Sequence, residues 1–306
     1  MNRAADDHFE DAIPSKAGVP QWLTSMRQRL ALFPLSILQL GMRIGVGRVF
    51  FKAGLLKYQS FEFAVKLFED EYRIPFLAPA VAARIAMINE LTTSTLLFLG
   101  LATRLTTLPL FGMISVIQIF VYPRAWPDHL LWGSILLFLL TRGPGSLSMD
   151  YLIDHHFIRG RRFVAARAWL ARFPFSIVQL AMRLGVALAF FNAGLLKYRS
   201  FDYATQLFEE AYRIPFLAPA VAARIAMINE LTCSLLLMMG LATRLATLPL
   251  LAMIVIIQII YPTAWPDHVL WGSILIFLLT RGPGPLSIDH LIGRYLRKRG
   301  NGAPIQ

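Results

Sequence analysis

The chain has 306 residues, of which 56% are hydrophobic and 16% are charged, and its formal net charge is +12. With a mean hydropathy of +0.56, it is too apolar for an ordinary soluble domain, and this indicates a membrane protein with several spans. The positive charge does not predict nucleic-acid binding, because the basic residues lie in short connections between apolar runs. The single cysteine, Cys233, excludes an intramolecular disulfide and a cysteine-rich metal site.

The sequence contains an internal duplication. The stretch from Tyr72 to Thr92 returns unchanged from Tyr212 to Thr232, and similarity extends over most of the chain in both directions. Two copies of one module are therefore predicted. The predicted organisation is an N-terminal tail (1–32), a first module (33–153), a basic linker (154–172), a second module (173–292) and a basic C-terminal tail (293–306).

Each module offers four apolar runs, which in the first copy cover residues 35–56, 77–101, 105–121 and 127–141. The runs are continuous and do not alternate every second residue, so they predict helices rather than the strands of a membrane barrel. The expected fold is an all-α integral membrane protein of two tandem four-helix transmembrane bundles. An even number of spans per module makes the two copies parallel internal repeats.

Basic residues predict the orientation of these spans. Lys and Arg are concentrated in the tails, the linker and the turns at Arg104 and Arg244, whereas the opposite loops are rich in acids. The positive-inside rule then places both termini in the cytoplasm. On the opposite side, residues 61–72 have apolar side chains at helical spacing and predict a helix lying in the membrane interface.

Small and polar residues predict two structural details. Small side chains four positions apart on the first helix, Gly41 with Gly45 and Ala181 with Gly185, favour close helix packing within each bundle. Ser148 and Ser287 follow a Gly-Pro break at the end of each module, where a serine side chain can cap a short helix.

A cation and a carboxylate fall inside the predicted spans of each module. Counted from residues 56 and 77, Arg43 and Glu90 share one depth of about 20 Å, and Arg183 and Glu230 repeat this arrangement. Opposite charges at one depth on antiparallel helices predict an intramembrane salt bridge. Two interpretations stay open: the pair clamps the two helices together, or Glu90 exchanges protons beside a bound redox or transported molecule.

Further polar residues are candidates for binding a substrate. Arg84, with its twin Arg224, lies about 10 Å inside its span and either reaches the outer surface or binds an anionic head group or a polarised carbonyl. The remaining candidates are Asn89, Asn229, Lys57 and Lys197. No metal site is predicted, because each WPDH motif supplies one histidine without a second within a helical turn.

Three motifs recur in both copies. The first copy carries MRIGVGRVFFKAGLLKY, NELTTSTLLFLGLATR and GPGSLSMD, and the second carries MRLGVALAFFNAGLLKY, NELTCSLLLMMGLATR and GPGPLSID. With these motifs each module resembles the DoxX family of small four-span membrane proteins, over residues 33–153 and 173–291. The positions that resemble the family's recurring polar ones are Arg43, Lys57, Glu90, Arg104, Arg183, Lys197, Glu230 and Arg244.

The resemblance implies a protein of the bacterial cytoplasmic (inner) membrane and a role in quinone-linked sulfur oxidation or in redox and detoxification complexes. We therefore expect a redox-linked accessory subunit that interacts with quinone and with a membrane or periplasmic redox partner. No complete catalytic site is expected, and the catalytic residues are unknown. The alternatives are a transporter of a small solute or lipid, and a structural membrane partner.

Overall fold

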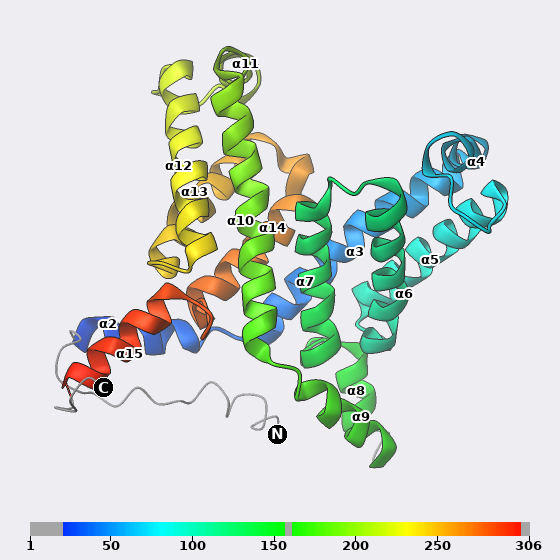
Figure 1. Cartoon of the computed structure of the whole chain (residues 1–306), viewed down its shortest axis with the longest axis horizontal. Helices are drawn as coiled ribbons and strands as arrows, with labels where there is room; N and C mark the ends of the chain where they lie inside the picture. The colour runs from blue at the N-terminus through cyan, green and yellow to red at the C-terminus, as the bar shows by residue number, and fades with distance from the viewer. Residues whose placement is uncertain (1–20, 157–160, 301–306) are drawn as a thin grey trace.

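The computed structural model describes residues 21–156 and 161–300, and within these ranges the chain is helical without strands. The helices of the first module are α3 (Leu35–Gln59), α5 (Pro79–Leu99), α6 (Thr103–Val116), which η2 (Ile117–Val121) continues, and α7 (Trp126–Arg142). Those of the second are α10 (Phe175–Arg199), α12 (Pro219–Met239), α13 (Thr243–Ile260) and α14 (Trp265–Arg281). The prediction of an all-helical chain with two copies of one four-helix module is confirmed (Figure 1).

Among the described residues, four helices are long and apolar enough to cross a membrane by length and composition, and they cover residues 103–121, 175–199, 219–239 and 243–260. Helix α3 adds a fifth when it is joined to residues 25–31, from which it is bent by 56°. The fourth helix of each module has 17 residues, which gives it a length of about 25 Å. It is therefore shorter than a hydrocarbon core of about 30 Å.

Short helices cover the two ends of the molecule. At one end lie α4 (Phe61–Leu67) with η1 (Phe68–Tyr72), and α11 (Phe201–Leu207) with η3 (Phe208–Tyr212). At the other end lie α2 (Gln21–Ala31), α8 (Met149–His156), α9 (Arg161–Ala171) and α15 (Ile288–Gly300) (Figure 1). We call these the outer and the terminal end. The predicted serine caps are confirmed, because Ser148 Oγ accepts from Tyr151 N and Ser287 Oγ accepts from His290 N, both at 3.2 Å.

The two modules exchange contacts: the first helix of each module packs against the fourth helix of the other module. A Cβ placed on Gly45 of α3 would lie 2.8 Å from the Leu270 Cα of α14, and one on Gly185 of α10 would lie 2.8 Å from the Leu131 Cα of α7. Only glycine permits so close a backbone approach. Close packing at the small residues is therefore confirmed, but the expectation that it lies within each bundle is wrong, since each first helix crosses the fourth helix of the other module.

Hydrogen bonds at the terminal end repeat this exchange. Arg281, the last residue of α14, donates to the carbonyls of Ala31 and Phe33 before α3, both at 3.0 Å. Arg142, the last residue of α7, donates to the carbonyls of Ala171 and Phe173 before α10, at 3.2 and 3.3 Å. Each fourth helix is therefore hydrogen-bonded to the segment that precedes the first helix of the other module.

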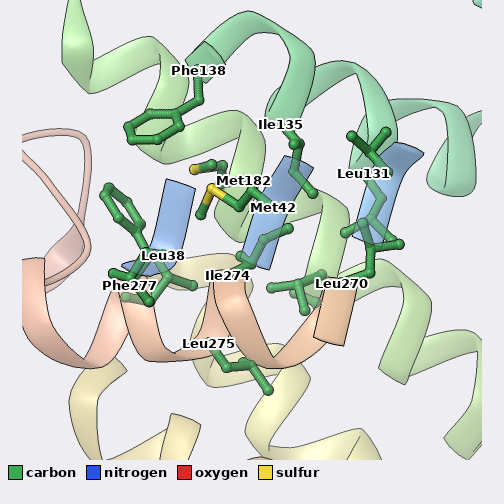
Figure 2. Packing of buried hydrophobic residues seen from close by; sticks show 14 of the residues in the cluster. Leu38, Met42, Leu131, Ile135, Phe138, Met182, Leu270, Ile274, Leu275 and Phe277 are labelled. Carbon is green, nitrogen blue, oxygen red and sulfur yellow. The ribbon is translucent and has the colours of Figure 1, made fainter. Parts of the chain in front are cut away.

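One hydrophobic core results from this exchange. It contains buried residues of both modules, and Figure 2 shows Met42 beside Met182, with Ile135, Phe138, Ile274 and Phe277 around them. The rings of Phe138 and Phe277 lie 5.5 Å apart in an edge-to-face arrangement, which adds to their burial energy. The two repeats therefore fold around a shared centre.

The exchange predicts a specific cross-link in the full chain. A Cβ at Gly41 would lie 3.3 Å from Ser273 Cβ, which is close to the spacing of about 3.5–4.5 Å in a disulfide. On a Cys233→Thr background, the pair Gly41→Cys and Ser273→Cys should form an intramolecular disulfide, detected by a mobility shift on non-reducing electrophoresis. The pair Gly41→Cys and Ser134→Cys, which tests packing within one module, should not. The reverse pattern would contradict the exchanged contacts.

A second prediction concerns the glycine crossing itself. Gly45→Ala should lower the free energy of unfolding by about 1–3 kcal/mol, because the added methyl overlaps the backbone of α14 and forces the helices apart. Gly112→Ala is the matched control, since no atom lies within 4 Å of a Cβ at Gly112, and it should not destabilise the fold. Thermal unfolding of both variants in detergent gives the comparison, and equal melting temperatures would contradict the close crossing.

Candidate functional site

A buried ion pair joins the first and second helices of each module. Lys57 Nζ lies 2.8 Å from both carboxylate oxygens of Glu90, and Lys197 Nζ lies 2.8 Å from both oxygens of Glu230. The side chain of Glu90 is 4% exposed and that of Lys57 is 13% exposed. An ion pair with so little access to water is stable only when its geometry is good, and the symmetric contact to both oxygens meets this requirement.

A glycine in the first helix makes room for this pair. A Cβ on Gly54 would lie 2.9 Å from Glu90 Cβ, and Gly194 stands in the same relation to Glu230. Helices α3 and α5 are therefore in close contact at the level of the carboxylate. Lys57 is one turn from Gly54 on the same face of α3, so its ammonium reaches Glu90 directly.

The predicted salt bridge between Arg43 and Glu90 is wrong, as is its counterpart between Arg183 and Glu230. Gly54, which faces Glu90, lies eleven positions beyond Arg43 on α3, or about 16 Å along the helix. The prediction assumed that residues 56 and 77 share one depth. In fact the first turns of α5 extend past the end of α3, where Ala82 and Ala83 pack against the outer helices.

Arg43 instead lies near the terminal end, where it faces Gly100 at the end of α5. It is only 1% exposed, and its Nη2 donates to the Leu147 carbonyl at 2.6 Å. Within the described part of the chain, its Nε and Nη1 atoms have no hydrogen-bond partner. Its twin Arg183 donates to the carbonyls of Pro283 and Leu286 at 3.1 and 2.7 Å.

The loop after the fourth helix completes this terminal site. Gln39 donates to the Gly143 carbonyl at 3.0 Å, and Asp150 accepts from the backbone amides of Ala102 and Thr103 at 2.6 and 2.8 Å. Asp150 therefore caps the start of α6, and its negative charge also acts on Arg43. The sequence did not predict this capping role, because Asp150 stands at the end of the GPGSLSMD motif, whose Gly-Pro pair indicated only the end of a helix. Asp289 makes the same two bonds in the second module.

The other polar candidates are placed as follows. Arg84 and Arg224 are exposed, and their guanidinium groups lie 5.5 and 5.4 Å from the ring centres of Phe61 and Phe201, a cation–π arrangement. The amides of Asn89 and Asn229 donate to the carbonyls of Pro109 and Pro249 at 3.3 and 3.2 Å and so link neighbouring helices. Arg104 and Arg244 donate to the carbonyls of Thr141 and Thr280 at 3.4 and 3.3 Å.

The histidines of the WPDH motifs are buried and hydrogen-bonded to a neighbouring helix. His129 Nδ1 lies 2.6 Å from Gln118 Oε1, and His268 Nδ1 lies 2.7 Å from Gln258 Oε1. Gln118 uses its amide nitrogen on the Pro123 carbonyl, so its oxygen acts as the acceptor and the histidine Nδ1 carries the proton. Among the described residues, no three His, Cys, Asp or Glu side chains gather to hold a metal.

Tyrosines at the outer end distinguish the two modules. Tyr72 and Tyr122 stack edge to face with ring centres 5.9 Å apart, and the Tyr122 hydroxyl donates to the Glu71 carboxylate. This hydrogen bond, together with partial burial, raises the pKa of Tyr122 above its usual value. The second module repeats the tyrosine pair, but Ala211 replaces Glu71, and the link through the carboxylate is therefore specific to the first module.

The fold and its paired buried charges define a helical membrane protein made of a duplicated four-helix module. The chain belongs to the DoxX family, whose sequence profile matches residues 38–123 and again residues 178–262. It is also 30% identical over 131 residues to an uncharacterised protein of Haemophilus influenzae, an alignment that covers 40% of this chain and 82% of that protein. No solved structure matches the chain.

The buried ion pair gives a prediction about stability. Lys57→Met removes the cation and leaves a buried carboxylate unpaired, which should lower the free energy of unfolding by about 3–5 kcal/mol. Adding Glu90→Leu should restore most of this loss, because an apolar pair of similar volume carries no uncompensated charge. Thermal unfolding of the single and double variants measures the coupling. Additive losses would show that Lys57 and Glu90 do not stabilise each other.

Proposed function

We propose that this protein is a redox-linked accessory subunit of the bacterial cytoplasmic membrane, with both termini in the cytoplasm, and that it binds a quinone head group. The observation that carries the proposal is a shallow, open depression of about 230 Å³ on the surface of α12, lined by Ala220, Val221, Arg224, Ile225 and Ile228; we call it the groove. It combines one guanidinium with an apolar surface. This combination suits a quinone, since its ring is apolar and its carbonyl oxygens accept hydrogen bonds.

The surroundings of Arg224 support this assignment. Its guanidinium makes no hydrogen bond to the described part of the chain, and the Phe201 ring lies 5.4 Å from it. The donor groups are therefore available to a carbonyl oxygen, while the cation–π contact restricts their position. Arg84 makes the same contact with Phe61 in the first module, so a second quinone site is proposed there.

The outer end offers a surface for the proposed membrane or periplasmic redox partner. Glu62, Glu69 and Asp70 are exposed on α4 and η1, and acidic side chains on such a surface favour a partner with a basic face. In this proposal the protein supplies quinone to a partner that carries the redox centre. The ion pairs and the buried arginines then stabilise the scaffold and take no part in electron transfer.

Small molecules extracted from the purified full chain test the proposal. Mass spectrometry should detect bound quinone, and Arg224→Gln should lower quinone affinity about tenfold, because a hydrogen bond from a charged donor is lost. Arg199→Gln is the matched control, since it removes an exposed arginine outside the groove. A protein without quinone that moves solutes in vesicles would be a transporter, and one that only co-purifies with other subunits would be structural; either result would overturn the proposal.

A further inference from the structure

The four helices at the terminal end come from two parts of the chain. Helices α2 and α15 belong to the two ends of the sequence, and α8 and α9 occupy the corresponding positions at the junction of the modules (Figure 1). None of the described side chains of these four helices belongs to the shared hydrophobic core. They contact the spans through backbone carbonyls, as at Ala31 and Ala171, and through the capping carboxylates of Asp150 and Asp289.

Helix α15 presents an apolar face that the described part of the chain leaves exposed. Leu291, Ile292 and Leu296 are 61%, 45% and 54% exposed. Ile292 and Leu296 follow Leu291 by one and five positions, which places all three on one side of the helix. Leaving three such side chains in water costs free energy in proportion to their exposed area. A surface that removes them from water is therefore expected at this end of the molecule.

The rest of this end is basic. Arg294 is exposed and lies three positions from Leu291, towards the polar side of α15, and Arg27 and Arg29 are exposed on α2. The acid of α15, Asp289, is already engaged, because its carboxylate caps the start of α13 through Ala242 and Thr243. The sequence adds Arg297, Lys298 and Arg299. Positive charge next to an apolar stripe is typical of a helix that lies on an anionic lipid surface.

The corresponding helices at the junction of the modules, α8 and α9, are less basic. Asp154 replaces Gly293 and His155 replaces Arg294 in the aligned copies, and the Asp154 carboxylate forms an ion pair with Arg167 of α9. Part of the positive charge on α9 is therefore neutralised within the protein. An anionic lipid surface should be attracted more strongly by the pair α2 and α15 than by the pair α8 and α9.

We infer that α2 and α15 form a binding surface for anionic phospholipids. In this arrangement Leu291, Ile292 and Leu296 enter the boundary between head groups and acyl chains, while Arg27, Arg29 and Arg294 face lipid phosphates. The position of α15 directly after α14 places it where the membrane-crossing part of the chain ends. This binding surface does not depend on the proposed quinone site, which lies on α12.

Spin labels on the full chain in vesicles test the position of α15. On a Cys233→Thr background, a label at Leu291→Cys should be accessible to oxygen and protected from a water-soluble nickel chelate, and a label at Arg294→Cys should show the opposite pattern. Ile292→Cys provides a second label on the apolar face if Leu291→Cys does not fold. Equal access of the nickel chelate to all the labels would overturn the inference.

The preference of the protein for anionic over neutral lipids tests the role of the basic residues. Native mass spectrometry of the full chain with phosphatidylglycerol and phosphatidylcholine should show a preference for the anionic lipid, and Arg294→Gln should lower this preference about fivefold, the effect expected of one basic residue near the surface. Arg124→Gln removes an exposed arginine from the outer end and should have a smaller effect. Equal effects of the two substitutions would contradict a lipid site on α15.

Discussion

The close crossing of each first helix over the fourth helix of the other module is the contact on which the structure depends. Gly45 and Gly185 allow the backbones to meet at Leu270 and Leu131, and the shared core then forms between the two crossings. Lipid chains are as apolar as the core, so close packing rather than the hydrophobic effect must hold these helices together. A single module would leave both of its crossing faces without this packing.

The buried charges act on a different pair of helices. Lys57 with Glu90, and Lys197 with Glu230, connect the first helix of a module to its own second helix. The glycine crossings join the modules, whereas the ion pairs preserve each module's internal register. Arg43 and Arg183 add a third kind of contact, because each binds carbonyl groups of the loop that follows the fourth helix of its own module. Each first helix is therefore fixed along its whole length.

Much of this architecture could be predicted from the sequence, because helices, caps and repeats depend on local patterns. The ion-pair partners could not, since depth was counted from the ends of apolar runs and α5 extends beyond α3 to pack on the outer helices. The exchange between modules was also hidden. The fourth helices read WPDHLLWGSILLFLLTR and WPDHVLWGSILIFLLTR, so their faces are almost identical, and no local pattern indicates which first helix each one contacts.

Differences between the copies separate what the fold requires from what it permits. Both copies keep the ion pair, the buried arginine, the capping aspartate and the close glycine. The substitutions that alter charge at the two ends, Ala211 for Glu71 and Gly293 for Asp154, lie outside the shared core. Interior polar groups are costly to change one at a time, because each substitution leaves a buried partner unpaired. The ends carry no such cost, and the two halves of the molecule are therefore free to present different surfaces there.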